Sequence, residues 1–246
     1  MDISGDFTRR ILRSIGIKKG AAVLDFGCGS GAVTFELAKI VGSEGSVTGV
    51  DSGPESIENA RAEAEARGVA NVKFRQIDLT ALPEDLGRYD AMFGRRVLMY
   101  LPNPLEAVKA LSEHLKPGGV FIAHEHDFAF RYSGNHNHPA FDRGRDLAQA
   151  MLEHEGAQTR LGPKLFEMFD EAGLTRRNAR TAVLTHTPDN PYPLADMLRM
   201  SKSRIDAASL LSRQEYEELL ERLEKEQSIE GIYLADLMFG VWGYKD

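Results

Sequence analysis

Apolar and polar positions alternate along the first half of the chain with two different periods. Short apolar runs predict five strands, at 23–26, 46–50, 72–77, 89–93 and 120–123. Segments with apolar residues three and four positions apart predict helices, at 32–41, 54–67 and 104–115. Strands that alternate with helices of about ten to fifteen residues are typical of right-handed βαβ units. The first half therefore predicts a mainly parallel sheet in an α/β fold.

The second half continues this pattern less regularly. A helix is predicted over 162–173, and strands are predicted over 181–185 and 237–244. A proline-rich break at 189–193 precedes two further predicted helices. The sequence contains no internal repeat and no flexible linker that would divide it.

These elements predict one domain over residues 1–246. Its fold class is α/β, with a doubly wound, mainly parallel sheet of seven strands. Two insertions, at 131–158 and 191–230, are expected to cover a ligand pocket, the second as a helical lid before the last strand. The candidates to line that pocket are Met197, Leu198, Met200 and Ile205.

Two helix starts have the sequence of a capping box, in which a serine and a glutamate three positions later satisfy each other's backbone N–H groups. Ser52 with Glu55 is the first pair, and Ser212 with Glu215 is the second. Pro54, inside the first pair, suits the first position of a helix. We therefore expect helices to begin at both sites.

The most informative segment is 25–31, which reads Asp-Phe-Gly-Cys-Gly-Ser-Gly. Gly27, Gly29 and Gly31 stand on alternate positions between a predicted strand and a predicted helix, where glycine permits a sharp turn close to a ligand. The helix after the turn offers unpaired N–H groups and the positive end of its dipole. Asp51 ends the next strand, 20 residues after Gly31, where a carboxylate suits the hydroxyls of a ribose.

Composition and charge narrow the range of partners. The chain has 246 residues, with 30 Lys and Arg against 37 Asp and Glu, which gives a net charge of −7. No basic stripe accompanies this acidic balance, which argues against nucleic acid as a partner. A single cysteine, Cys28, excludes an internal disulfide and a cysteine-rich zinc site. Because no apolar run is long enough for a membrane helix and the N-terminus lacks the features of a signal peptide, we expect a cytoplasmic protein without a membrane partner.

The segment 25–31 resembles motif I of the class I S-adenosylmethionine-dependent methyltransferases, a family with a Rossmann-like fold. The resemblance extends from about residue 7 to residue 127 and implies S-adenosyl-L-methionine as the cofactor. It implies that Asp51 binds the ribose hydroxyls and that Asp78 accepts a hydrogen bond from the adenine amino group. The residues that it assigns to donor binding are Asp25, Gly27, Gly29, Gly31, Asp51, Ser52, Asp78 and Leu79.

Other segments fit the same family. Residues 89–93 resemble its motif IV, and 115–122 resemble its turn into the fifth strand. Arg95 follows the fourth strand, at the edge where ligands bind, and is a candidate contact to the methionine portion of the donor, a lid partner or a solvated side chain. The signatures Asn-Pro-Pro-Tyr and Pro-Cys of nucleic-acid methyltransferases do not follow that strand. The chain therefore resembles the bacterial small-molecule and menaquinone-biosynthesis-type group.

The segment 124–127 reads His-Glu-His-Asp and continues the fifth strand to the same edge, with His136 and His138 shortly after it. Three interpretations stay open: residues that bind the acceptor and act as its general base, a divalent metal site, or a polar loop. The catalytic candidates under the first interpretation are His124, His126 and Asp127. No metal is expected, because the chain has no second cysteine and no histidine pair at helical spacing.

The expected function is methyl transfer from S-adenosylmethionine to an O, N or C atom of a small organic acceptor, by in-line displacement. A non-catalytic sensor or scaffold that binds the donor or a nucleotide on the same fold is the alternative. A nicotinamide-dependent oxidoreductase is disfavoured, because Ala32 stands where the dinucleotide fingerprint has its third glycine. Cys28 is expected to be inert between its flanking glycines. The sequence carries no signal for an oligomeric state.

Overall fold

The computed structural model describes residues 3–131, 138–229 and 232–246. Within these residues, seven strands form one sheet in the order β3-β2-β1-β4-β5-β7-β6. The strands are β1 (Ala22–Phe26), β2 (Ser46–Asp51), β3 (Val72–Gln76), β4 (Tyr89–Arg95), β5 (Leu115–Asp127), β6 (Thr175–His186) and β7 (Tyr233–Tyr244). Neighbours are parallel from β3 to β5, whereas β7 is antiparallel to β5 and β6. The predicted mainly parallel sheet of seven strands is confirmed.

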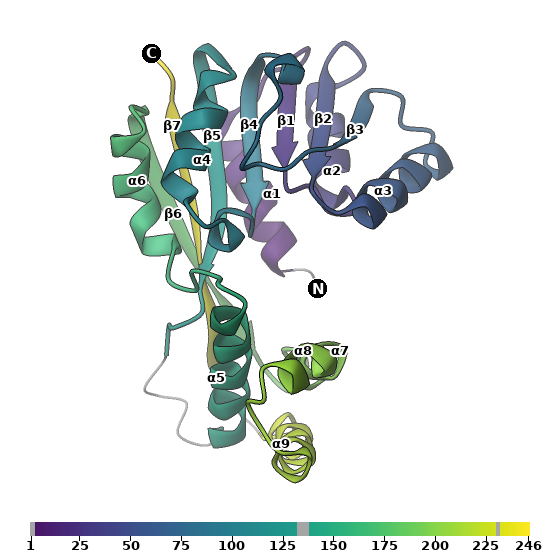
Figure 1. Cartoon of the computed structure of the whole chain (residues 1–246), viewed down its shortest axis with the longest axis vertical. Coiled ribbons are helices and arrows are strands. Elements are labelled where there is room, and N and C mark those ends of the chain that lie inside the picture. Colours follow the sequence, from purple (N-terminus) through teal and green to yellow (C-terminus); the bar gives the residue numbers. More distant parts are fainter. Residues whose placement is uncertain (1–2, 132–137, 230–231) are drawn as a thin grey trace.

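Helices cover both faces of the sheet. They are α1 (Ile3–Ile15), α2 (Ala32–Val41), α3 (Pro54–Ala66), α4 (Pro104–Glu113), α5 (Pro139–His154), α6 (Leu165–Glu171), α7 (Leu194–Met200), α8 (Lys202–Ala207) and α9 (Arg213–Glu226). Short 3₁₀ helices are η1 (Glu84–Leu86), η2 (Leu98–Tyr100) and η3 (Gly162–Lys164). Figure 1 shows α4 and α6 in front of the sheet and α1 behind it. This arrangement is the doubly wound fold that the sequence predicts.

The last three strands are longer than the sequence predicts. β5, β6 and β7 have 13, 12 and 12 residues. They extend past the carboxyl ends of β1 and β4 to a second body made of α5, α7, α8 and α9 (Figure 1). β6 is an edge strand whose first half is polar and largely exposed. Apolar periodicity therefore indicates only the last part of this strand.

One of the two predicted capping boxes forms. Ser212 and Glu215 cap α9 reciprocally, each accepting the backbone N–H of the other. α3 begins instead after Gly53, with a proline in its first turn and no side-chain cap. The capping box predicted at Ser52 is wrong, because the carboxylate of Asp51 takes the N–H of Gly53 at 2.9 Å and turns the chain there.

The helical body follows the predicted insertions with differences. Three helices, α7, α8 and α9, follow the break at 189–193 in the described residues, rather than the predicted two. The helix predicted over 162–173 consists of η3 and α6. α5 packs against α7, α8 and α9, so the segments 131–158 and 191–230 meet in space. Residues 132–137 and 230 of these segments lie outside the described residues. No described helix is long and apolar enough to cross a bilayer.

Close packing fixes the carboxyl ends of the central strands. The rings of Phe26 and Phe121 lie 5.2 Å apart, and those of Phe121 and Phe169 lie 5.3 Å apart, which links β1, β5 and α6. A Cβ on Gly94 of β4 would lie 2.0 Å from the Phe26 ring, so only glycine allows this approach. The edge of the sheet where the candidate site lies is therefore rigidly held.

Candidate functional site

The glycine loop between β1 and α2 turns at three left-handed residues. Gly27, Gly29 and Gly31 have φ angles of 67°, 52° and 87°, a region that favours glycine. A Cβ on Gly27 would lie 2.2 Å from Cγ2 of Val97, whereas a Cβ on Gly29 would meet nothing within 4 Å. Gly27 therefore permits close packing inside the protein. Gly29 faces open space, which a ligand can fill.

Asp51 links the glycine loop to the start of α3. Its Oδ2 accepts the N–H of Gly29 and its Oδ1 accepts the N–H of Gly53, both at 2.9 Å. The side chain is half-buried at the carboxyl end of β2. A carboxylate with two such bonds keeps lone pairs for further donors, such as ribose hydroxyls. The structure thus brings together Gly29 and Asp51, which are predicted to share a site.

Asp78 follows β3 at the same edge. The N–H of Ile77 donates to the backbone carbonyl of Asp51 at 2.9 Å, which places the two strand ends side by side. Asp78 is exposed, and hydrogen bonds from the N–H and hydroxyl of Thr80 lower its pKa. It is therefore an accessible carboxylate at neutral pH. Leu79 beside it is buried, whereas Ser52 beside Asp51 is exposed.

Asp25 lies inside the protein rather than on the open face of the loop. It is 2% exposed, and the hydroxyl of Thr34 in α2 donates to its Oδ2 at 2.6 Å. Burial raises the pKa of Asp25 to about 7, and the Thr34 bond and the charge of Arg95 offset part of this rise. Asp25 therefore ties α2 to β1, so its predicted donor contact is not direct in this arrangement.

Arg95 and Cys28 flank this buried carboxyl group. Arg95 ends β4, which lies between β1 and β5 in the sheet, and its charge lowers the pKa of both Asp25 and His124. Burial and the carboxylates of Asp25 and Asp51 raise the pKa of Cys28. A protonated, buried thiol is unreactive. Burial and this charge environment, rather than the flanking glycines, give the physical reason to expect an inert Cys28.

His124 and His126 project from the same face of β5 into different surroundings. His124 is fully buried, with Nδ1 3.0 Å from the hydroxyl of Thr8 in α1 and its ring edge-on to Phe7. Burial lowers the pKa of His124 well below its usual value, and the charges of His126, Arg95 and Arg96 lower it further. Such a histidine is a weak proton acceptor at neutral pH. The structure therefore disfavours His124 as the general base.

His126 lies beside a buried polar network between β5, β7 and α5. Nδ1 of His126 is 3.7 Å from Oδ2 of Asp236, within ion-pair range. Asp236 accepts hydrogen bonds from Arg145 and from the hydroxyl of Tyr192, each at 2.8 Å. Burial alone would raise the pKa of Asp236, but these three neighbours hold it below its usual value. One buried carboxylate thus contacts His126, Arg145 and Tyr192.

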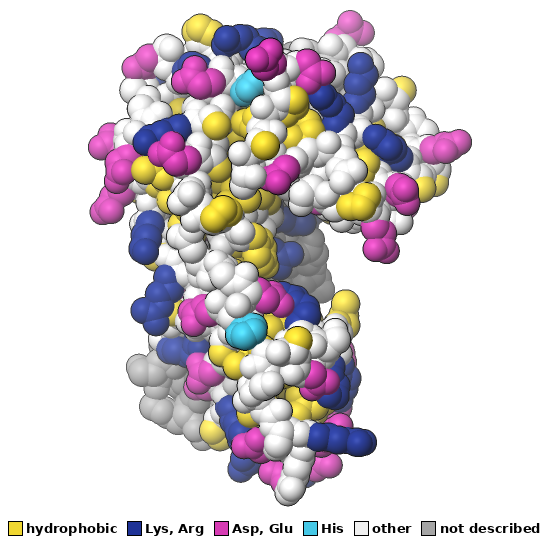
Figure 2. All heavy atoms as spheres, in the orientation of Figure 1, with side chains coloured by type: hydrophobic (Ala, Val, Ile, Leu, Met, Phe, Trp, Pro, Cys, Tyr) yellow, Lys and Arg dark blue, Asp and Glu magenta, His cyan; other side chains and the backbone are white. Residues whose placement is uncertain are grey.

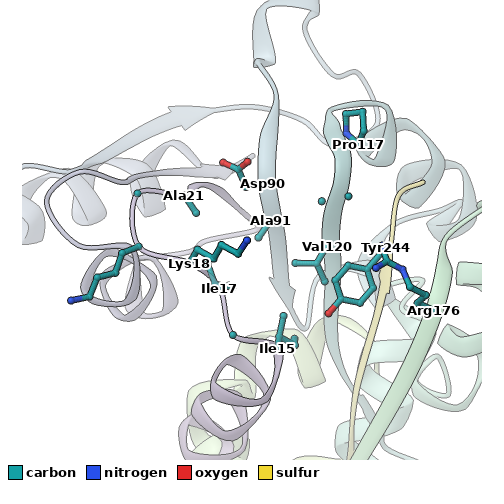
Figure 3. A pocket seen from close by; sticks show the side chains of 15 residues that line it. Ile15, Ile17, Lys18, Ala21, Asp90, Ala91, Pro117, Val120, Arg176 and Tyr244 are labelled. Carbon is teal, nitrogen blue, oxygen red and sulfur yellow. The ribbon is translucent and has the colours of Figure 1, made fainter.

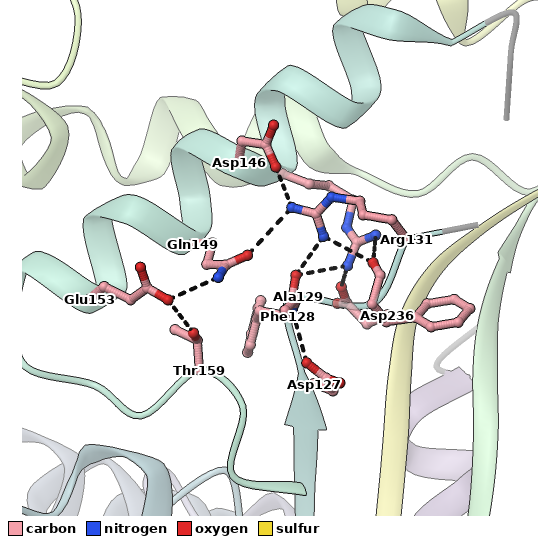
Figure 4. A network of polar contacts seen from close by, with 11 residues as sticks. Asp127, Phe128, Ala129, Arg131, Asp146, Gln149, Glu153, Thr159 and Asp236 are labelled. Atoms are coloured by element: carbon pink, nitrogen blue, oxygen red, sulfur yellow. Dashed lines mark hydrogen bonds and ion pairs between the residues drawn. The ribbon is translucent and has the colours of Figure 1, made fainter. Parts of the chain in front are cut away.

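Asp127 and the later histidines do not join His126 in one cluster. Asp127 accepts at Oδ1 the N–H of the residue two positions later, at 2.9 Å, and so shapes the turn after β5 (Figure 4). His138 stacks on Tyr233 in the helical body, with ring centroids 3.9 Å apart. His136 lies outside the described residues. Within the described residues, no group of three His, Cys, Asp or Glu side chains is arranged to hold a metal ion.

The surface of the molecule is hollowed on one side. Figure 2 shows a hollow on the right of the molecule, between the sheet and the helices α7 and α8. Met197 and Met200 of α7 are 37% and 86% exposed, whereas Leu198 and Ile205 are buried. Two of the four residues predicted to line an acceptor pocket are therefore accessible, and the other two pack the helical body.

A separate cavity of about 520 Å³ lies at the opposite edge of the sheet (Figure 3). Its lining includes Ala21 before β1, Asp90 at the start of β4, and Tyr244 at the end of the antiparallel β7. None of the residues predicted to bind donor or acceptor lines it. This cavity is therefore separate from the candidate site at the carboxyl edge.

Sequence analysis misses three polar residues of this region, Glu125, Asp236 and Tyr192. Alternate residues of a strand point to opposite faces of the sheet. Glu125 is therefore expected on the face opposite to that of His124 and His126. This alternation is the signal by which Glu125 could have been singled out. Asp236 and Tyr192 come from distant segments, and no local pattern connects them to β5.

The fold is a doubly wound sheet, and its first glycine turn opens beside a carboxylate at the end of a strand. This combination defines a class of α/β proteins that bind nucleotide-containing cofactors. Within this class, a family described as "Methyltransferase domain" matches residues 17–173. The chain belongs to this methyltransferase family, as the resemblance in motif I predicts.

Curated relatives match slightly less than half of the chain. The chain is 37% identical over 100 residues to aklanonic acid methyltransferase DauC of Streptomyces sp. (strain C5), covering 41% of this chain and 46% of the relative. It is 33% identical over 117 residues to demethylmenaquinone methyltransferase of Staphylococcus aureus (strain MRSA252), covering 48% of each. The chain thus spans less than half the length of these relatives.

Solved structures share the whole fold. A putative methyltransferase from Bacillus halodurans C-125 has a TM-score of 0.65 at 19% identity, covering 98% of this chain and 100% of that one. The cyclase SpnF has a TM-score of 0.63 at 18% identity, covering 98% of this chain and 80% of that one. Because one neighbour is named as a methyltransferase and another as a cyclase, the fold by itself does not define the reaction.

Proposed function

We propose that the protein is an S-adenosylmethionine-dependent methyltransferase that acts on a small organic acceptor. The observation that carries the proposal is the open face of Gly29 beside the carboxylate of Asp51, at the carboxyl edge of the sheet. The residues proposed to hold the donor are Gly27, Gly29, Gly31, Asp51, Ser52, Asp78, Leu79 and Arg95, with Asp25 acting through α2.

The residues present fit this donor. Asp51 accepts hydrogen bonds from the ribose, and the exposed, ionised Asp78 accepts one from the adenine amino group. The first turn of α2 and the charge of Arg95 attract the amino-acid carboxylate. When bound, S-adenosylmethionine supplies a methyl group on a positively charged sulfur. Alignment of the acceptor with that methyl group and exclusion of water then provide most of the acceleration.

We place the acceptor in the hollow between the sheet and the helices α7 and α8. The helix α7 borders this hollow and carries the exposed Met197 and Met200, whose side chains are apolar and adaptable. The names of the two curated relatives, which refer to aklanonic acid and demethylmenaquinone, support a small organic acceptor. The net charge of −7 disfavours nucleic acid. A cytoplasmic location stays a prediction from the sequence.

His126 is the residue proposed to take a proton from the acceptor. It shares the face of β5 with His124, whose pKa burial lowers well below its usual value. The carboxylate of Asp236 lies 3.7 Å from Nδ1 of His126, within ion-pair range. Asp127 shapes the turn next to this site rather than accepting the proton itself.

Calorimetry tests donor binding directly. S-adenosylhomocysteine, the demethylated product, should bind with a micromolar dissociation constant, and NAD should give no saturable heat. Tight binding of NAD without binding of S-adenosylhomocysteine would show that the glycine loop serves a different cofactor.

A donor-binding module without catalysis is the second candidate. It is favoured by the burial of His124 and His126, which are 0% and 2% exposed. Incubation with methyl-labelled S-adenosylmethionine and a metabolite extract separates the two functions. Label in a small product supports the enzyme, and donor binding without any labelled product supports the module.

A further inference from the structure

The two carboxyl oxygens of the fully buried Glu125 have different surroundings. Its Oε1 accepts the N–H groups of Val97 and Leu98, at 2.9 and 2.8 Å. Its Oε2 is buried and has no hydrogen-bond partner among the described residues. An unpaired carboxylate oxygen in the interior is costly.

The turn that Glu125 holds comes directly after β4 and is strained. Arg96 has a φ of 55°, which is unfavourable for a residue with a side chain. Its N–H donates to the carbonyl of His124 at 2.8 Å. The next two N–H groups, of Val97 and Leu98, both go to Glu125. Two adjacent residues of β5 thus fix three consecutive N–H groups of this turn.

The same turn supports the glycine loop. The side chain of Val97 lies so close to Gly27 that a Cβ there would be 2.2 Å from Val97 Cγ2. The contacts therefore run from Glu125 through Val97 to Gly27. Gly27 is two residues from Gly29, whose open face is the proposed donor site.

We propose that Glu125 is a positioning residue for donor binding, which holds Val97 against Gly27 and so keeps the glycine loop in its binding shape. The proposal rests on the donor site of the proposed function. Glu125 does not touch the donor and acts only through Val97. Burial raises the pKa of this carboxyl group to about 7, so an uncharged amide is a suitable replacement for it.

The test compares Glu125→Ala with Glu125→Gln by calorimetry with S-adenosylhomocysteine. Glu125→Ala should raise the dissociation constant about ten-fold, because the turn that supports the glycine loop loses two hydrogen bonds. Glu125→Gln keeps an acceptor for both N–H groups and should bind within about two-fold of the parent. In turnover assays, the KM for the donor should rise in Glu125→Ala while kcat at saturating donor changes little.

Glu226 provides a matched control in the helical body. Its carboxylate accepts the N–H groups of Ala140 and Phe141 at the start of α5, at 2.8 and 2.9 Å. Glu226→Ala removes the same kind of double acceptor away from the donor site. It should lower the free energy of unfolding without changing the dissociation constant of S-adenosylhomocysteine. Equal weakening by Glu226→Ala and Glu125→Ala would reduce Glu125 to a general stabilising residue and overturn the proposal.

Two further variants keep the test decisive. Val97→Ala removes the contact with Gly27 and leaves Glu125 intact, so it should weaken binding even if Glu125→Ala does not fold. An unchanged dissociation constant in Val97→Ala, or a Glu125→Gln as weak as Glu125→Ala, contradicts the proposal. Asp51→Ala separates this failure from a failure of the donor site itself. If Asp51→Ala weakens binding and Val97→Ala does not, only the positioning role is wrong.

Discussion

At the scale of single residues, the donor site depends on side chains with two simultaneous tasks. Asp51 already accepts two backbone N–H groups, of Gly29 and Gly53, before any ligand is considered. Its removal therefore affects the shape of the loop as well as the contact to a ribose. Asp78 is the simpler case, since its carboxylate is exposed and held only by Thr80.

Asp51→Ala should weaken binding of S-adenosylhomocysteine by about ten- to a hundred-fold. Losing hydrogen bonds to a charged group costs about 1.5–3 kcal/mol, which corresponds to that range of affinity. Calorimetry on the folded variant measures the change. Glu55→Ala, an exposed residue in the first turn of α3, serves as the control and should bind normally. An unchanged affinity in Asp51→Ala would remove Asp51 from the donor site.

His126→Gln should lower turnover by about 10²–10⁴-fold, the usual effect of losing a general base, and leave donor affinity nearly intact. His124→Gln should have a smaller effect, because burial already lowers the pKa of His124 well below its usual value. Steady-state kinetics with an identified acceptor compares the two variants. Full activity in His126→Gln would leave alignment of the reactants as the main source of catalysis.

At the scale of elements, a buried ion pair joins the helical body to the sheet. Arg145 of α5 and Asp236 of β7 lie 2.8 Å apart, with both side chains only 3% exposed. Arg145 also donates to the carbonyl of Phe130 at 2.8 Å, which fixes the chain just after β5. On the solvent side, Arg131 pairs with Asp146 of α5 (Figure 4). The start of the helical body is therefore tied to the sheet by arginines.

Arg145→Ala should destabilise the protein by about 3–5 kcal/mol, because it leaves the carboxylate of Asp236 buried without its cation. Arg199→Ala removes an exposed arginine that pairs with Asp196 and Glu224 and should destabilise the protein much less, because surface ion pairs contribute little to stability. Urea unfolding of both variants measures the difference. Similar losses in the two variants would mean that the buried pair contributes no more than a surface pair.

The strands and helices also show where sequence patterns are sufficient to predict the position of an element. β1 and β2 occupy the predicted positions, because strands buried inside a parallel sheet are continuous apolar runs. The polar first half of β6 carries no such signal, since it pairs with β7 at the edge of the sheet. At the start of α3, Asp51 overrides the capping signal of Ser52 because its carboxylate reaches the same turn.

At the scale of the whole molecule, a group of buried rings joins β6 and β7 to the start of α5. Tyr233 lies between His138 and His186, with ring centroids 3.9 and 4.1 Å away. Burial, together with the charge of His138, lowers the pKa of His186 to about 4. Nδ1 of His186 accepts the N–H of Tyr192 at 2.6 Å and must stay unprotonated to do so.

The free energy of unfolding should therefore contain a part from His186 that is fully present above about pH 6.5, the usual pKa of histidine, and is lost as the pH falls towards 4. Between these values the unfolded chain binds more protons at His186 than the native protein does. Asp25 and Glu125, whose pKa values are raised to about 7, act in the opposite direction. A comparison of variants is therefore required to isolate His186.

His186→Gln keeps an acceptor for Tyr192 and removes the titration. Its free energy of unfolding should fall less steeply with acid than that of the parent, by up to about 1.4 kcal/mol per pH unit. Urea unfolding of both proteins at several pH values between about 4.5 and 7 measures the two slopes. Parallel slopes would show that His186 titrates normally in the native state.

The sequence by itself determined the parallel sheet, the glycine loop with Asp51, and membership of a methyltransferase family. These features depend on local patterns: apolar runs, helical spacing and glycines at fixed distances. Tertiary structure decided the surroundings of the polar residues at the end of β5. His124 lies under α1, His126 lies beside Asp236, and Glu125 holds the turn after β4. Burial and charge at these positions come from segments far apart in the chain, so only the folded structure sets their chemistry.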